Sequence, residues 1–253
     1  MQENLKGGEN SRIEDLPVPE FNLTDEQKLI LTGVADWVSN FFKNAEENNR
    51  VVMGGHGFDH NQRTAGIAAV IATREGYSPF LPALTSLIFD IGRTSTDPRA
   101  HNFRHGELSR EMAHDFIIGL PLADEEKTLV LNAIEDHPKL NDQIVGERRN
   151  WLQMILQDAD RLDTLGPIGI ARASSNRWRL PLFSDQIAIG TPEDTITTSF
   201  QDYAYRVPVW IESMWTKTGL EITQARMPYM QAAIAEIRKE AQYMHDAFGK
   251  LFE

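Results

Sequence analysis

The segment from Gln157 to Gly166 constrains this chain more than any other, because it places three aspartates in a short run that is otherwise apolar. Burying an ionised aspartate costs several kcal/mol unless a positive partner compensates for it. A helix that carries Asp158, Asp160 and Asp163 therefore needs cations, and Arg161 supplies a single positive charge. A metal ion is the natural remaining partner. Upstream residues of the metal-binding type can complete such a site, and they are His60, Asp90, His105 and His137.

The composition is that of a globular protein. The chain has 253 residues, 41% hydrophobic and 25% charged, which is enough for one sizeable core. A formal net charge of −12 disfavours binding to nucleic acid or anionic lipid, and the absence of cysteine excludes disulfides and thiolate chemistry. Residues 1–19 lack the apolar core of a signal peptide, and no apolar run is long enough for a membrane span. We therefore expect a soluble, cytoplasmic protein.

Apolar residues recur with helical spacing along most of the chain, whereas the alternating pattern of strands is scarce. This predicts an all-α protein, with residues 1–20 as a flexible lead-in and 21–253 as a single-domain helical bundle. The helix over 79–92 is apolar almost all round and should be buried. Segment 172–192, rich in Arg, Ser and Pro, is predicted to be irregular and able to overhang a site. The other helices are expected at about 24–48, 59–71, 105–119, 125–137, 147–164, 194–216 and 220–248.

The candidate site residues differ in how strongly the sequence supports them. Asp90 ends the apolar run from Ser86 to Gly92, so its carboxylate should be buried, which favours a functional role. His60 opens a predicted helix, where a histidine is more often a surface or capping residue. His137 ends another, where it could equally complement the helix dipole. Three histidines are interpreted as ordinary surface residues, namely His56, His114 and His245.

The order of these residues is more specific than any one of them. The succession of His60, Asp90, His105, His137 and Asp160 resembles that of the HD-domain metal-dependent phosphohydrolase superfamily. Three motifs carry the resemblance: His60-Asn61-Gln62-Arg63 for the family's His-x-x-Arg, Phe89-Asp90-Ile91 for its His-Asp-Ile, and Gln157 to Asp163 for its Gln-Asp-Ala-Asp-Arg-Leu-Asp. The resemblance covers about 50–245 and is strongest for the small bacterial branch that acts on nucleotides. It implies an all-α HD-domain bundle.

The resemblance also implies a metal centre. In it, His60, Asp90 and Asp160 hold a divalent metal, for which Mn, Fe, Ni, Co, Zn and Mg all remain open. The chain departs from the family because Phe89 stands where the family has a ligating histidine. Three protein ligands suffice in many catalytic zinc sites, but the loss should weaken binding by more than the roughly 10–100-fold typical of outer-shell changes. Binuclear relatives imply a second set, in which His105 and His137 bind a metal that Asp90 bridges.

The expected chemistry is metal-assisted hydrolysis. The metal should lower the pKa of a bound water and polarise a phosphoryl oxygen. Asp163 is a candidate for orienting the ligands or touching a ribose, and His105 or His137, if not a ligand, for protonating the leaving group. Arg63 and Arg93 are candidates for holding phosphate oxygens, with a solvated surface arginine as the alternative. Further candidates for substrate contacts, with salt bridges as the favoured alternative, are Arg172, Arg177 and Arg179.

Two hypotheses on function follow. The first is a metal-dependent phosphohydrolase or pyrophosphohydrolase acting on a nucleotide or related phosphate ester. The alternative, which Phe89 favours, is a catalytically impaired or inactive relative that binds a nucleotide or a partner without turnover. A mixed-valent di-iron oxygenase needs the full ligand set, and a nucleic-acid-binding module needs a basic stripe, so both are disfavoured. The last helix, in which Met227, Met230, Ile234 and Ile237 recur at helical spacing, favours core packing over a homodimer surface.

Overall fold

A computed structural model of the chain describes residues 16–48, 55–101, 104–139, 150–176 and 198–252. All regular elements within these ranges are helices, which confirms the all-α prediction. None of these helices combines the length and apolarity that a membrane span requires. The elements are α1 (Asp25–Glu47), α2 (Phe58–Arg74), α3 (Phe80–Ile88), the 3-10 helices η2 (Ile91–Thr94) and η3 (Pro98–His101), α4 (His105–Gly119), α5 (Asp124–Asp136), α6 (Trp151–Asp163), α7 (Gly166–Asn176), α8 (Ser199–Glu212) and α9 (Lys217–Gly249).

The predicted start of α1 is confirmed in detail. The Thr24 hydroxyl accepts a hydrogen bond from the Gln27 backbone N–H, and the Gln27 side chain accepts one from the Thr24 backbone N–H, each at 3.1 Å. This reciprocal cap satisfies backbone N–H groups that the first turn of a helix otherwise leaves without a partner. The expected bounds of α4 and α5 also agree with the structure to within one residue.

Several predicted boundaries were wrong, and the helix expected over 194–216 ends at Glu212. The α3 helix ends at Ile88 rather than near Gly92, because Asp90 leaves the α-helical region (φ −107°, ψ 11°) and a 3-10 turn follows. Residues 172–176 belong to α7, although the sequence predicted an irregular segment there. Gly166 has φ +81°, a left-handed conformation that suits glycine and lets the chain start α7 directly after α6. The rest of the predicted irregular segment lies outside the described residues.

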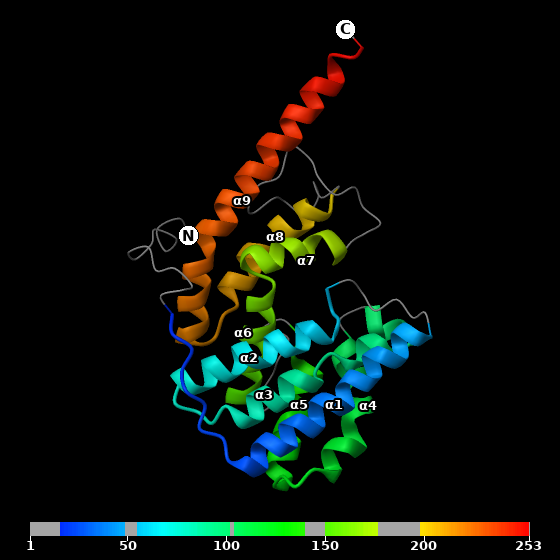
Figure 1. The fold of residues 1–253 in the computed structure, drawn as a ribbon, viewed down its shortest axis with the longest axis vertical. Helices are drawn as coiled ribbons and strands as arrows, with labels where there is room; N and C mark the ends of the chain where they lie inside the picture. Colours follow the sequence, from blue (N-terminus) through cyan, green and yellow to red (C-terminus); the bar gives the residue numbers. More distant parts are fainter. Residues whose placement is uncertain (1–15, 49–54, 102–103, 140–149, 177–197, 253) are drawn as a thin grey trace. The chain divides into compact units, whose positions relative to one another are not determined.

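The chain divides into two compact units. The N-terminal unit comprises Val18–Asp160 together with Trp215–Gly219, and the described part of the C-terminal unit lies within Arg161–Met214 and Leu220–Glu253. Figure 1 shows the helices α1 to α5 of the first unit and the long helix α9. That residues 21–253 act as one domain stays a prediction.

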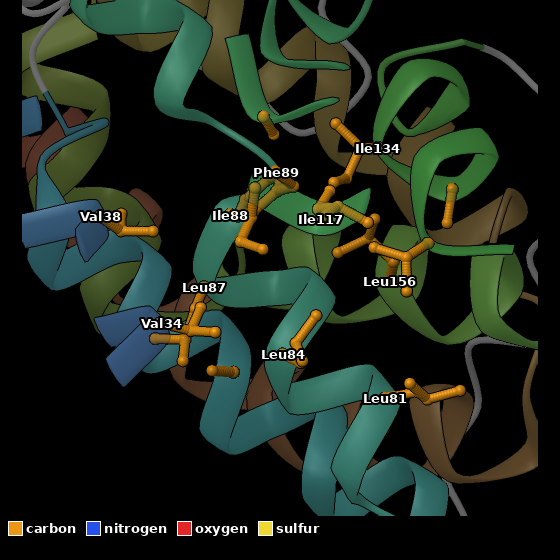
Figure 2. Close-up of a cluster of buried hydrophobic side chains, with 14 of the residues drawn as sticks. Val34, Val38, Leu81, Leu84, Leu87, Ile88, Phe89, Ile117, Ile134 and Leu156 are labelled. Carbon is orange, nitrogen blue, oxygen red and sulfur yellow. The ribbon is translucent and has the colours of Figure 1, made fainter. Parts of the chain in front are cut away.

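Helix α3 lies at the centre of the N-terminal unit, where it packs against α1, α2 and α5 (Figures 1 and 2). Its Leu84 and Ile88 are fully buried, as are Val34 and Val38 on α1. The prediction of a buried helix is therefore confirmed. Each such side chain contributes about 1.5–3 kcal/mol when it leaves water. The same core includes Phe89, so dense packing fixes the point at which the chain leaves α3.

In the C-terminal unit, α7 packs against α8, and α9 supplies a buried face. Met227, Met230 and Ile234 are buried, which confirms the core assignment for these three residues, and Ile237 is half-buried. The Gly166 turn lies against Arg226 of α9, whose guanidinium donates to the Leu162 carbonyl at the end of α6.

Candidate metal centre

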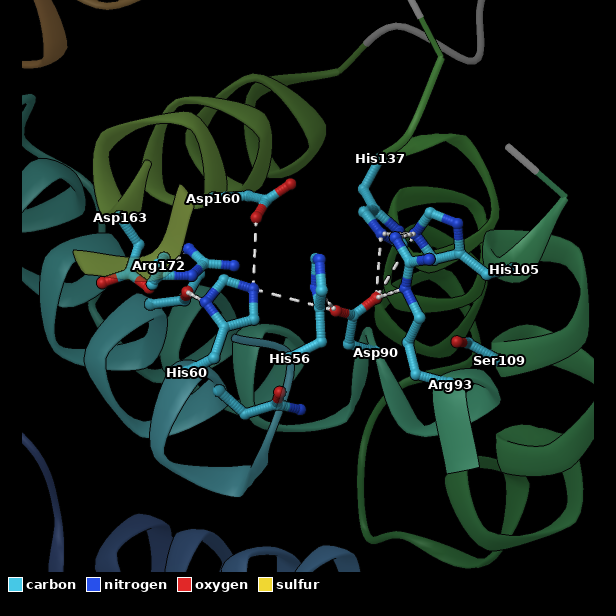
Figure 3. Close-up of polar contacts among 12 residues, drawn as sticks. His56, His60, Asp90, Arg93, His105, Ser109, His137, Asp160, Asp163 and Arg172 are labelled. Atoms are coloured by element: carbon cyan, nitrogen blue, oxygen red, sulfur yellow. Dashed lines mark hydrogen bonds and ion pairs between the residues drawn. The ribbon is translucent and has the colours of Figure 1, made fainter. Parts of the chain in front are cut away.

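Asp90 lies at the centre of the candidate site, in the turn that follows α3, and is 1% exposed. Its Oδ2 is 2.9 Å from His56 Nδ1 and 3.7 Å from His60 Nε2. Its Oδ1 is 3.3 Å from His105 Nε2 and 3.5 Å from His137 Nε2. One buried carboxylate thus lies between two pairs of imidazoles (Figure 3). The predicted burial of Asp90 is confirmed.

The ends of three helices bring three of these histidines together. His60 lies in the first turn of α2, His105 opens α4, and His137 caps the end of α5. Their positions depend on two close backbone approaches. A Cβ at Gly92 would lie 2.7 Å from the His105 carbonyl, and a Cβ at Gly106 would lie 2.5 Å from the Glu135 carbonyl. Glycine at these two positions therefore allows the start of α4 to meet both η2 and α5.

The hydrogen bonds of His105 and His137 define their tautomers. His137 Nδ1 is 2.7 Å from the Ile134 carbonyl, so it carries the proton and leaves the lone pair on Nε2. His105 Nε2 is 3.3 Å from an Arg93 guanidinium nitrogen, which can only donate. The two Nε2 atoms are 2.9 Å apart and both face Asp90 Oδ1. Two nitrogen acceptors and one carboxylate oxygen therefore converge, a donor set that suits a divalent cation.

The second pair of histidines meets two carboxylates. His60 is fully buried, and its Nε2 lies 3.3 Å from Asp160 Oδ1 of α6 and 3.7 Å from Asp90 Oδ2. His60 Nδ1 is 3.4 Å from the Thr64 hydroxyl one turn later in α2. The atom that faces the carboxylates is thus the one available to a cation. Of the predicted neighbours, His60 lies between the other two and faces both Asp90 and Asp160.

His56 is a site residue that the sequence analysis missed. It was interpreted as a surface residue, but its side chain is 14% exposed and contacts Asp90. Among the described residues, two groups have ligand atoms within 4.8 Å of one another: His56, His60 and Asp90, and Asp90, His105 and His137. Asp160 belongs to neither. The spacing of four residues between His56 and His60 could have indicated that both histidines face one site. The glycines on either side of His56 argued against a helix there and so hid this pattern.

Phe89 occupies the space between the two pairs of histidines. The side chain is fully buried, with its ring centroid 5.4 Å from that of His60 and 4.7 Å from that of His137. Both ring pairs are close to perpendicular, which is a favourable arrangement for aromatic rings. An apolar ring without a ligand atom thus stands at the position that lies within reach of both pairs.

The three aspartates of the 157–166 segment have separate roles. Asp158 accepts hydrogen bonds from the backbone N–H groups of Trp215 and Thr216, at 2.9 and 2.7 Å, and from the Thr216 hydroxyl at 2.7 Å. These donors just before α9 stabilise the buried charge, and the expectation that Asp158 needs a cation stays a prediction. Within the C-terminal unit, Asp163 accepts from the Arg172 guanidinium at 2.7 Å. Its expected contact with substrate stays a prediction.

Gln157 connects the same segment to the histidine at the end of α5. Its amide nitrogen donates to the carbonyls of Asp136, His137 and Lys139 at 3.0–3.3 Å. Its amide oxygen accepts from the Trp215 indole N–H at 2.9 Å. The last turn of α5 leaves carbonyls without helical partners, and Gln157 satisfies them. It thereby positions the backbone that carries His137.

The candidate arginines differ in environment. The Arg93 side chain is 10% exposed, with its Nε 3.5 Å from Asp90 Oδ1, and it donates to the Ala100 carbonyl at 3.1 Å. It therefore belongs to the buried site rather than to the solvated surface. Arg63 is 28% exposed and donates to Asp59 at 2.6 Å within α2. Its phosphate-binding role stays a prediction, and Arg177 and Arg179 lie outside the described residues.

The ionisation states of the candidate ligands suit the binding of a cation. Burial by itself would raise the pKa of Asp90, but the positive charge of Arg93, together with the neighbouring His137 and His56, holds it well below its usual range. Burial likewise opposes ionisation of Asp160, whose pKa His60 nevertheless holds below its usual value. Burial, followed by repulsion from Arg93, lowers the pKa of His56 to about 4. At neutral pH, both carboxylates are therefore charged and His56 is neutral.

The lowered pKa of His56 predicts a pH dependence of stability. As the pH falls from 6.5 to about 4, the unfolded chain binds a proton at His56 that the folded chain does not, so the free energy of unfolding should decrease. We expect a loss on the order of 1–3 kcal/mol over this window. Asp90 and Asp160 titrate below their usual value of 3.8, so the stability they provide is lost only under more acidic conditions.

Urea unfolding of EDTA-treated protein at a series of pH values measures this decrease. A His56→Asn variant, which has no titrating group at this position, should show a flatter profile between pH 6.5 and about 4. Parallel profiles for the two proteins would contradict the assignment to His56.

Solved structures share this fold, although no protein-family model and no curated protein matches the sequence. YpgQ of Bacillus subtilis, in complex with ADP, is 19% identical with a TM-score of 0.62, and the match covers 85% of this chain and 96% of that one. A Bacillus thuringiensis HD-superfamily hydrolase is 20% identical with a TM-score of 0.61, covering 85% and 97%. A predicted HD superfamily hydrolase from an uncultured Thermotogales bacterium is 21% identical with a TM-score of 0.55, covering 83% and 92%.

These matches span most of each chain, so they identify the fold of the protein. The chain has the all-α fold of the HD-superfamily hydrolases. The fold resemblance that the sequence motifs indicated is therefore confirmed by structural comparison.

Proposed function

We propose that the protein is a metal-dependent phosphohydrolase or pyrophosphohydrolase that acts on a small phosphorylated substrate. The observation that carries this proposal is the placement of Asp90, whose two carboxylate oxygens each face a pair of buried imidazoles. Imidazoles around an ionised carboxylate suit a transition-metal ion. The fold of the HD-superfamily hydrolases supports the same class of reaction.

The residues of the candidate site have separate proposed roles. His60, Asp90 and Asp160 hold one divalent metal, and His105 and His137 can hold a second with Asp90. When bound, such a metal supplies the positive charge that acidifies water and polarises a phosphoryl oxygen. Asp160, whose side chain is 26% exposed, is the member of the site most accessible from solvent.

The positive side chains would handle the phosphate. Arg93 keeps Asp90 ionised and stays within 3.3 Å of His105, so it maintains the charge balance at the centre. Arg63 follows His60 by one turn and is partly exposed, so a phosphate oxygen can replace its Asp59 partner. Whichever of His105 and His137 does not bind metal would donate a proton to the leaving oxygen once its Nε2 has taken one up.

A nucleotide is the substrate class that we propose. The structural relative YpgQ of Bacillus subtilis was solved with ADP, and its match covers 85% of this chain. The predicted role of Arg63 at a phosphate agrees with this choice.

Metal content and nucleotide hydrolysis test the proposal together. Protein purified without chelator should contain near-stoichiometric metal by mass spectrometry, and an Asp160→Ala variant should contain less. Treatment with EDTA should abolish hydrolysis of ADP and related nucleotides, and reloading with Mn, Ni, Fe or Co should restore it. Absence of both metal and turnover after reloading would refute the proposal.

Phe89 supports the alternative of a relative that binds a nucleotide without hydrolysing it. Its ring is fully buried and provides no ligand atom between His60 and His137. The same assay decides between the two, because protein that retains metal and binds ADP without releasing phosphate would be the non-catalytic relative.

A further inference from the structure

His56 lies against Asp90, in the same group of candidate ligand atoms as His60. Its Nδ1 is 2.9 Å from Asp90 Oδ2, and the ligand atoms of His56, His60 and Asp90 all lie within 4.8 Å of one another. The rings of His56 and His60 are perpendicular, with centroids 5.3 Å apart. Two imidazoles and one carboxylate form a set of three protein ligands, which is the number that catalytic zinc sites commonly use.

The local backbone directs His56 into the site. Gly55 has φ +78°, a left-handed conformation that favours glycine, and it turns the chain immediately before His56. Gly57 follows, and a Cβ there would lie 2.8 Å from the exposed Asp59 carboxylate in the first turn of α2. The chain thus passes close to the start of α2, and His56 reaches a carboxylate 34 residues away in sequence.

The burial of His56 agrees with a ligand role. The His56 side chain is 14% exposed and lies against the Asp90 carboxylate, which is 1% exposed. His114, by contrast, lies on the surface with a side chain that is 52% exposed, and it offers a matched control histidine.

The number of ligands explains why His56 matters in this chain. Phe89 offers no ligand atom, and Asp160 lies outside both compact groups of the described residues. Without His56, the group on the Oδ2 side of Asp90 would contain one histidine and one carboxylate. With His56, it contains three ligands. In this way His56, which precedes α2, supplies the imidazole ligand that Phe89 does not.

We propose that His56 is a protein ligand of the metal at His60 and Asp90, and that it replaces the imidazole absent from position 89. This inference rests on the metal site of the proposed function. It assigns a ligand that neither the family resemblance nor the sequence analysis includes. The remaining coordination positions are open to Asp160 and to the substrate.

Binding of Co²⁺ to the metal-free protein tests the inference without using activity. Titration against a competing chelator gives the affinity and the number of ions per chain, and the visible spectrum of Co²⁺ reports its ligands. We expect His56→Ala to lose one ion per chain or to weaken its binding by roughly tenfold or more. His114→Ala should bind Co²⁺ as the parent protein does.

Two further variants separate ligation from a structural hydrogen bond. His56→Asn keeps a donor that can reach Asp90 but removes the imidazole, so it should lose Co²⁺ as His56→Ala does. The double variant His56→Ala/Phe89→His places an imidazole back within reach of His60 and should recover the ion. Circular dichroism confirms that each variant is folded, and His56→Asn is the informative protein if His56→Ala is not.

The outcomes distinguish this inference from the proposed function. If the parent protein binds Co²⁺ and both His56 variants bind it with the same affinity and spectrum, His56 is no ligand and the metal site stands without it. If the parent protein binds no ion, the proposed function fails and the inference with it. Loss in both variants with recovery in the double variant establishes the replacement.

Discussion

Replacing Asp90 by asparagine is expected to abolish metal retention and hydrolysis together. Asp90 is the one residue common to both groups of candidate ligands among the described parts of the chain. Asparagine keeps the shape of the side chain but removes the negative charge that faces four imidazoles and Arg93. The loss should exceed the roughly 10–100-fold that changes outside the ligand set produce.

Metal analysis and phosphate release measure this effect on the same sample. Asp202→Asn is the matched control, because Asp202 is also a buried aspartate, but it pairs with Arg206 in α8 and lies in neither ligand group. The control should retain metal and turnover. An Asp90→Asn protein that is folded and still holds metal at the parent level would show that the carboxylate is not the shared ligand.

Phe89→His is expected to strengthen metal binding by roughly tenfold or more, since it adds a ligand atom between His60 and His137. The effect on stability should depend on metal. Without metal, the change replaces a fully buried apolar ring with a polar one and should cost about 1–3 kcal/mol. With metal, binding to the folded state should reverse this loss.

Thermal unfolding with and without Co²⁺, together with the chelator titration, measures both parts. Phe80→His is the matched control, because Phe80 is a buried phenylalanine at the opposite end of the same helix α3. It should destabilise the protein without gaining affinity for metal. If Phe89→His lowers stability equally with and without Co²⁺, the side chain at position 89 does not bind the metal. The protein is then better described as an inactive relative.

Local sequence patterns predicted the helices well because the information they use is local. The Thr24 capping box and the helical spacing of apolar residues act over a few neighbours, so α1, α4 and α5 appear where they were expected. Asp90 was also predictable, since a carboxylate at the end of an apolar run must be buried with the helix that precedes it. The failures at 172–176 and at the end of α3 arose where one glycine or one turn redirects the chain.

The roles of the individual carboxylates needed contacts that are distant in sequence. Asp158 and Asp160 look equivalent in the sequence, but Asp158 meets backbone donors 57 and 58 residues away just before α9, and Asp160 meets His60. No pattern within the segment distinguishes them, because the partner that stabilises each charge comes from another helix.

By itself, the sequence determined the all-α class, the buried helix α3 and the succession of His60, Asp90, His105 and His137. Only the tertiary structure decided which groups meet, because it brings the four imidazoles to opposite oxygens of Asp90. It also turned His56 from an apparent surface residue into a neighbour of Asp90. The physical reason is that helix formation depends on nearest neighbours along the chain, whereas a metal site depends on side chains whose distances are set by helix packing.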